Sequence, residues 1–307
     1  MDSILEVQDV VKQYGDYTAL NKVSLSVPKG SIYGLLGPNG AGKTSLIRII
    51  NQITMPDSGQ VIFDGEPLQP HHVQYIGYLP EERGLYKTMK VGEQCLYLAQ
   101  LKGLSKAQAT EQLQYWFDRL GIKGWWNKKI QELSKGMAQK IQFVVCVLHK
   151  PKLLIFDEPF SGFDPVNANL IKDEILELKK QGSTIIFSTH RMESVEELCD
   201  HIALIHQSNK LIEGQLTEVK KQYRTNSFQV GILTDNVEGL MYDITQKFTV
   251  GQTDFKSLND ELKLEVQLGN TTPNELLQVL TGRGQVTHFV EKIPSVNDIF
   301  IRTVTEK

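Results

Sequence analysis

Residues 37–44 read Gly-Pro-Asn-Gly-Ala-Gly-Lys-Thr, between an apolar strand-like run at 31–36 and a helix-like run at 44–50. The three glycines let the backbone curl so that successive N–H groups can point at phosphate oxygens. The helix that follows adds the positive end of its dipole at the same place. Lys43 can reach the outer phosphates, and the Thr44 hydroxyl can bind Mg²⁺. A chance glycine-rich turn would lack this strand–loop–helix order, so the stretch predicts a nucleoside triphosphate site.

The residues that we expect to bind the triphosphate here are Gly37, Pro38, Asn39, Gly40, Ala41, Gly42, Lys43, Thr44 and Ser45.

Length and composition indicate the number of domains and the cellular compartment. A chain of 307 residues suits about two domains, and 40% hydrophobic residues are enough for a buried core. Three scattered cysteines without metal-like spacing indicate a reducing, cytosolic compartment. Residues 1–6 do not resemble a signal peptide, and the longest apolar block, 143–148, is far shorter than the ~20 residues of a membrane span. If the protein serves a membrane process, we expect another chain to cross the bilayer.

Charge is unevenly distributed along the chain. Residues 83–150 hold 12 Lys/Arg against 4 Asp/Glu, an excess of +8, whereas the whole chain carries −3. Such asymmetry suggests that this region faces an anionic partner, or that it is a solvated basic surface, and the sequence leaves both readings open.

The spacing of apolar residues divides the chain into three regions. Residues 4–11 alternate like a half-buried strand, whereas helical spacing dominates from about Val91 to Leu148. Strand patterns at 152–156 and 184–188 are joined by a helix at about 165–181, which predicts a largely parallel sheet. After Tyr223 the pattern is that of a small α+β module without a catalytic motif. The expected fold class is therefore α/β, with a first domain at 1–222 that includes a helical part at about 84–150, and an accessory domain at 223–307.

Two carboxylates follow the strand at 152–156, where residues 152–159 read Lys-Leu-Leu-Ile-Phe-Asp-Glu-Pro. The carboxyl end of this strand should lie beside the phosphate loop. Asp157 is then expected in the Mg²⁺ shell, and Glu158 is placed to polarise the attacking water. Taken alone the pair is equally compatible with an acidic turn, but the loop at 37–44 favours the catalytic interpretation.

Four further features have plain structural explanations when taken alone. Ser134, before Lys135 and Gly136, is a plausible N-cap whose helix start could bind an anion or simply be capped. Residues 161–165 form a turn into a helix, and His190 follows the strand at 185–189. Tyr14 could stack on a base or pack at a strand edge.

In this order the motifs resemble the ATP-binding cassette (ABC) family over about residues 4–220. The resemblance implies a P-loop NTPase core with a mixed, largely parallel sheet, an antiparallel β subdomain and a helical subdomain. It also implies that such domains work as head-to-tail pairs, with each ATP held between one chain's phosphate loop and the other chain's Ser134 region. The roles that it implies are a Walker A loop at 37–44, a Walker B aspartate at Asp157, a catalytic glutamate at Glu158, an LSGGQ-type motif at Ser134, Lys135 and Gly136, a D-loop ending at Asp164, a switch histidine at His190, and an adenine-stacking aromatic at Tyr14.

The sequence departs from the family pattern at two places. Glu81 stands where the family usually has glutamine; it can still bind Mg²⁺ or water but adds negative charge near the γ-phosphate. Residues 133–137 read Leu-Ser-Lys-Gly-Met rather than Leu-Ser-Gly-Gly-Gln, so Lys135 could place a cation near the partner's ATP.

Residues 79–86, 133–137 and 294–300 together resemble one bacterial subgroup, the ATPase subunits of exporters related to sodium-efflux and antibiotic-resistance systems. This resemblance implies ATP and Mg²⁺ as cofactors, a homodimer or heterodimer, and a separate integral membrane permease at the inner face of the cell membrane. The alternative is a non-transport ABC ATPase that acts on nucleic acid or the ribosome. Such chains usually carry two cassettes or a long coiled-coil insertion, and this sequence has neither. No nucleic-acid partner is therefore expected, and the transported substrate stays open.

Overall fold

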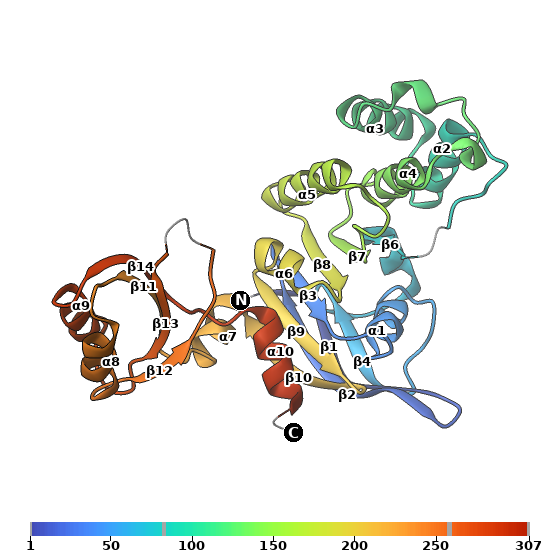
Figure 1. Cartoon of the computed structure of the whole chain (residues 1–307). Coiled ribbons are helices and arrows are strands. Elements are labelled where there is room, and N and C mark those ends of the chain that lie inside the picture. Colours follow the sequence, from blue (N-terminus) through green and yellow to red (C-terminus); the bar gives the residue numbers. More distant parts are fainter. Residues whose placement is uncertain (1, 82–83, 257–259, 306–307) are drawn as a thin grey trace. The chain divides into compact units, whose positions relative to one another are not determined.

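The computed structural model describes residues 2–81, 84–256 and 260–305 (Figure 1). It divides into two compact units, residues 1–216 and 217–307. This division lies close to the change of sequence pattern near Tyr223, and the exact boundary between residues 222 and 223 stays a prediction. Glu82 and Arg83, part of the run behind the subgroup resemblance, lie outside the described residues.

A six-stranded sheet forms the centre of the first unit (Figure 1). Its strands, from one edge to the other, are β10 (Asn209–Gln215), β9 (His201–His206), β3 (Ile32–Leu36), β8 (Thr184–Thr189), β7 (Leu153–Asp157) and β6 (Ile76–Leu79). All neighbours run parallel except β9 and β10. The strands β3, β7 and β8 are buried along their whole length, as parallel strands covered on both faces must be. The predicted parallel sheet is therefore confirmed.

An antiparallel sheet shares its core with the central one. Its strands lie in the order β2 (Tyr17–Pro28), β1 (Ser3–Tyr14), β4 (Ser58–Phe63) and β5 (Glu66–Pro67). Leu5 and Val7 of β1 belong to the same buried cluster as Ile155 of β7. Burial alternates along β1, because one face of the strand packs on the core and the other faces outward.

Helices connect the strands of the central sheet. They are α1 (Lys43–Ile50), α5 (Pro165–Lys180) and α6 (Met192–Leu198), and α7 (Leu216–Gln222) follows β10. Helix α5 begins where the sequence predicts, because the Asp164 carboxylate accepts the N–H groups of Val166 and Asn167 at 3.1 and 3.0 Å.

The predicted helical insertion lies between β6 and β7. Its α-helices are α2 (Val91–Leu101), α3 (Lys106–Arg119) and α4 (Lys135–Val147), and the short 3₁₀ turns are η1 (Pro70–Tyr75) before β6 and η2 (Lys123–Trp125) and η3 (Ile130–Glu132) within the insertion. The ring of Trp116 meets that of Phe143 edge to face, with centroids 5.8 Å apart. Phe143 in turn stacks on Phe156 of β7 at 5.7 Å. Helix α4 therefore attaches the insertion to the sheet through its aromatic core.

The second unit is an α+β module, as expected. Its antiparallel sheet has the order β12 (Thr249–Gln252), β13 (Leu262–Gln267), β11 (Ser227–Leu233) and β14 (Gln285–Glu291), and its helices are α8 (Val237–Thr245), α9 (Pro273–Thr281) and α10 (Val296–Thr305). Leu240 of α8 and Leu276 of α9 are buried in one cluster with Val230 and Ile232 of β11. Both helices thus cover the same face of this sheet. Within the described ranges, no helix is long and apolar enough to cross a bilayer.

Gly77 tests the attachment of α4 to the sheet. A Cβ at this position of β6 would lie 2.3 Å from the backbone oxygen of Cys146 in α4. We expect Gly77→Ala to lower the melting temperature by about 2–12 °C, because overpacking costs ~1–3 kcal/mol and each kcal/mol shifts a unit of this size by ~2–4 °C. Gly124→Ala is the matched control, since nothing lies within 4 Å of its added Cβ. Equal melting temperatures in thermal scans of the two variants would contradict this packing.

Candidate active site

The phosphate loop joins β3 to α1 in a conformation that only glycine accepts at two of its positions. Gly37 and Gly42 have φ values of 144° and 114°. A Cβ at Gly37 would lie 2.0 Å from the Ile205 oxygen, and one at Gly42 would lie 2.3 Å from the Ala19 oxygen. Gly42 is also the N-cap of α1, and no side chain caps this helix. Its first N–H groups are therefore available to an anion.

Lys43 is buried within this loop. Its Nζ donates hydrogen bonds to the carbonyl oxygens of Gly37 at 2.6 Å and Pro38 at 3.0 Å. Burial lowers the pKa of the ammonium group, although the carboxylates of Glu158, Asp157 and Glu81 act in the opposite direction. A cation that is removed from water in this way is stabilised by an anionic ligand.

The phosphate loop and the acidic residues line one cavity of about 300 Å³. Its lining residues are Tyr17, Asn39, Gly40, Ala41, Gly42, Lys43, Thr44, Ser45, Glu81, Asp157 and Glu158. Ten of these eleven were expected from the sequence, and Tyr17 was not. Three of the four chain segments that meet here follow β3, β7 and β6, which end at the same edge of the central sheet, and the fourth is Tyr17 of β2.

The acidic wall of the cavity suits a divalent cation. Burial raises the pKa of Asp157, and the negative charges of Glu81 and Glu158 act in the same direction. Three carboxylates thus face one ammonium group in a small space. Oxygen ligands of this kind are those that Mg²⁺ prefers, so the residues present fit the ion implied by the family. Thr44, Asp157 and Glu81 would hold it.

Glu158 directly follows β7, and its carboxylate is fixed by residues at the end of β8. One carboxylate oxygen, Oε1, accepts the backbone N–H of His190 at 2.8 Å and lies 2.6 Å from His190 Nδ1. The other, Oε2, accepts the Thr189 hydroxyl at 3.1 Å. The residue is 9% exposed and still lines the cavity. Sequence order alone placed Glu158 and His190 on neighbouring strands, and the structure brings them into direct contact.

Two tyrosines lie near the loop, and only one of them lines the cavity. Tyr17, at the start of β2, donates its hydroxyl to the Gly40 oxygen at 2.6 Å. Tyr14, at the end of β1, is outside the cavity lining, and Lys12 Nζ lies 5.5 Å from its ring centroid. Tyr14 and Tyr17 are register partners in the β1–β2 pair. The base-stacking role of Tyr14 stays a prediction, and Tyr17 is a residue that sequence reasoning missed.

The remaining predicted residues lie outside this cavity. Ser134 caps α4 by accepting the Met137 N–H at 3.2 Å, and Lys135 and Gly136 form the first turn of that helix. Asp164 caps α5, and its hydrogen bond from Asn167 lowers its pKa. A single chain does not bring these residues to the phosphate loop.

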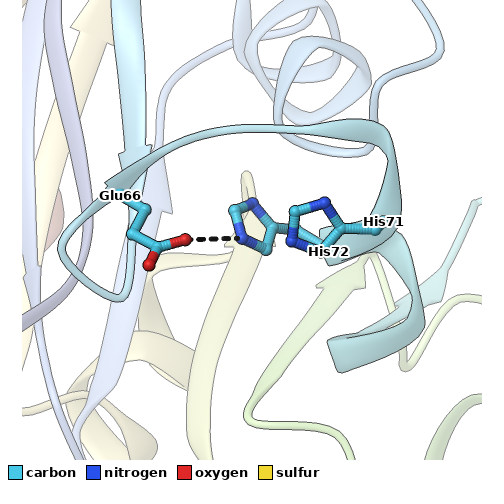
Figure 2. Close-up of side chains that lie close together, drawn as sticks. All are labelled: Glu66, His71 and His72. Atoms are coloured by element: carbon cyan, nitrogen blue, oxygen red, sulfur yellow. Dashed lines mark ion pairs between the residues drawn. The ribbon is translucent and has the colours of Figure 1, made fainter.

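Glu66, His71 and His72 form a second cluster, shown in Figure 2. Their ligand atoms lie within 4.8 Å of one another, a spacing that a metal ion could use. However, Nδ1 of His72 accepts the Gln69 N–H at 3.0 Å, so the neutral ring carries its proton on Nε2, which lies 3.8 Å from Glu66. A metal at Nε2 would have to displace that proton and the bond to Gln69. We therefore assign His72 to the capping of η1.

Two family models match the sequence. Residues 20–161 match the ABC transporter model, and residues 214–304 match the C-terminal domain of DrrA1-3-like ATP-binding proteins. The uncharacterized ABC transporter ATP-binding protein YhaQ of Bacillus subtilis (strain 168) is 42% identical over 98% of each chain. The chain belongs to the ABC transporter ATP-binding family. It is accordingly an ATPase, and the resemblance inferred from its motifs is confirmed.

Other members agree with this assignment over most of their length. The linearmycin resistance ATP-binding protein LnrL of Bacillus subtilis (strain 168) is 30% identical, covering 93% of this chain and 91% of that protein. A solved structure described as the ATP binding subunit of an ABC transporter has a TM-score of 0.67 and 31% identity, covering 72% of this chain and 93% of that one. The expected P-loop α/β fold is thereby confirmed.

The two tyrosines can be separated by kinetics. We expect Tyr17→Ala to raise the KM for ATP about tenfold, because an aromatic contact with a base is worth ~1–2 kcal/mol. Tyr14→Ala is the matched comparison, and Tyr17→Phe separates the ring from the hydroxyl that binds Gly40. A larger increase in KM for Tyr14→Ala than for Tyr17→Ala would instead support the base-stacking role that the sequence predicts for Tyr14.

Proposed function

We propose that the chain is the ATP-hydrolysing subunit of an exporter and that it pairs head to tail with a second ATP-binding subunit over Mg²⁺ and ATP. The pair would drive a separate permease in the membrane. The observation that carries this proposal is the position of Glu158. Its carboxylate is fixed by Thr189 and His190 and lines the same cavity as the phosphate loop.

The phosphate loop, Glu158 and His190 have separate roles in this proposal. The loop N–H groups and Lys43 bind the phosphates, with Lys43 exchanging its bonds to the Gly37 and Pro38 oxygens for phosphate oxygens. Glu158 acts as the general base that orients and deprotonates the attacking water. His190 holds the Glu158 carboxylate in place. When bound, Mg²⁺ would neutralise charge that develops on the phosphates.

Pairing of two chains would give a role to the predicted residues that lie away from the cavity. Ser134 caps α4 through a single N–H group, so other N–H groups at this helix start can still meet an anion. Helix α4 spans 13 residues and directs the positive end of its dipole to the same place. In a head-to-tail pair, Ser134, Lys135 and Gly136 of one chain would close over the triphosphate of the other. Asp164 would lie at the same interface.

Export and membrane association are supported by relatives. LnrL is named for linearmycin resistance, and a Streptococcus pyogenes relative, 32% identical over 69% of this chain, is named as a lantibiotic transport ATP-binding protein. The first name describes resistance to a compound, and the second describes transport of one. We infer a permease partner and a place at the inner face of the cell membrane by this analogy. The partner subunit would be a second copy or a related chain.

Lys43→Ala tests nucleotide binding. ATP at a concentration of 100 Kd stabilises the parent by ~2.7 kcal/mol and so raises its melting temperature. The variant loses the buried cation of the cavity, so we expect ATP with Mg²⁺ to raise its melting temperature by less than about 1 °C. Lys123→Ala, outside the cavity and paired with Asp118, should keep the parent's shift. An unchanged shift in Lys43→Ala would show that the triphosphate binds elsewhere.

Glu158→Gln tests hydrolysis and pairing together. The amide keeps the shape of the carboxylate but cannot take a proton, so turnover should fall about 10²–10⁴-fold. ATP should then accumulate at the site and hold two chains together, which size-exclusion chromatography with ATP would detect as a dimer. Glu193→Gln, an exposed site in α6, is the control. A Glu158→Gln variant that stays monomeric and hydrolyses ATP normally would overturn the proposal.

A further inference from the structure

Gln139 lies in the second turn of α4 and reaches the loop that follows Glu158. The residue is 9% exposed. The amide nitrogen Nε2 donates to the Pro159 oxygen at 3.3 Å and to the Ser161 oxygen. Hydrogen bonds between buried groups are costly to break, because the separated groups would be left without partners. These two bonds therefore fix the loop to the helix.

The loop begins at a residue in an unfavourable backbone conformation. Glu158 has a φ of 50°, in the left-handed region that non-glycine residues seldom occupy. Such a conformation persists only where the surroundings hold it on both sides. On the sheet side, the Glu158 N–H donates to the Ser188 oxygen at 2.9 Å. On the far side, the Ser161 N–H donates to the Glu158 oxygen at 3.0 Å, within the turn that Gln139 holds.

A second contact joins the same two segments. A Cβ built at Gly162, where φ is 87°, would lie 2.3 Å from Cε of Lys135 and 2.8 Å from its Cδ. The aliphatic part of Lys135 therefore occupies the space in front of Gly162. Lys135 was expected to place its charge near a partner's ATP, and that role stays a prediction. In the single chain its stem packs on the loop after Glu158.

We infer that Gln139 is a positioning residue of the ATPase reaction. Through Pro159 and Ser161 it links the start of α4, near Ser134, to the backbone that holds Glu158 of the same chain. This rests on the proposed function, in which Ser134 closes over the triphosphate of the partner. Closure at one nucleotide would then set the general base that serves the other, through two hydrogen bonds within one chain.

Gln139→Met is the direct test, because methionine keeps the length and burial of the side chain and removes both donated bonds. Gln142→Met is the matched control. Gln142 lies on the same helix, is 7% exposed, and makes no hydrogen bond to residues 159–161 of the described structure. Gln139→Glu is a second variant, which keeps the shape and turns two carboxylate oxygens toward the two carbonyls. Each variant is measured in the full-length chain.

We expect kcat of Gln139→Met to fall about tenfold, which corresponds to ~1.4 kcal/mol of lost transition-state stabilisation, a loss typical of one to two hydrogen bonds. The KM for ATP and the melting shift with ATP should change by less than twofold. Gln139→Glu should lose at least as much turnover. Gln142→Met should keep kcat within about twofold of the parent.

Two results would overturn the inference. One is turnover in Gln139→Met equal to that of Gln142→Met. The other is a parallel loss of kcat, ATP affinity and melting temperature in Gln139→Met, which would indicate a purely structural role. A double variant, Gln139→Met with Glu158→Gln, separates this inference from the proposed function. If the double variant still forms an ATP-dependent dimer, pairing does not require Gln139, and the loss of turnover in Gln139→Met is then an effect on the reaction alone. Absence of the dimer in Glu158→Gln alone instead refutes the pairing.

Discussion

The parallel pairing of β3, β8, β7 and β6 is the constraint on which the site depends. In this register Leu36 lies beside Thr189, Ser188 beside Asp157, and Phe156 beside Leu79. The chain leaves each strand at the same edge, so the phosphate loop, His190, Glu158 and Glu81 come from distant parts of the sequence to one place. A shift of one strand by a single residue would move its polar end to the opposite face of the sheet. The apolar, fully buried strands make such a shift costly.

Electrostatics then decides what this edge can hold. A buried ammonium group and three carboxylates share about 300 Å³. The pKa of Lys43 is lowered and that of Asp157 is raised, both chiefly by burial, so each group is held in an environment that disfavours its charge. An anion beside the ammonium group and a cation beside the carboxylates relieve both costs together. A phosphate chain with a bound divalent ion meets this requirement, whereas either ion alone meets half of it.

Sequence patterns were sufficient for the parts of the molecule that depend on local order. The loop at 37–44, the carboxylates after the strand at 152–156 and the helix that begins at Asp164 could each be placed from neighbours within a few residues. Tyr17 could not, because Tyr14 and Tyr17 flank the same tight turn and are directly paired across two strands. Which ring turns toward Gly40 depends on the packing of the hairpin against the loop. Gln139 was missed for a similar reason, since a glutamine in a helix gives no local sign of the carbonyl groups that it meets.

The strained backbone of Glu158 explains why contacts outside the cavity matter to its chemistry. The side chain is bound by Thr189 and His190, but these bonds fix only the carboxylate. The backbone must also be kept in the left-handed region, which requires support from the segment that follows. That segment lies on α4 through Gln139 and Lys135. Helix α4 in turn stacks on β7 through Phe143 and Phe156. Glu158, the general base of the proposed function, is therefore held between the end of the sheet and a helix of the insertion.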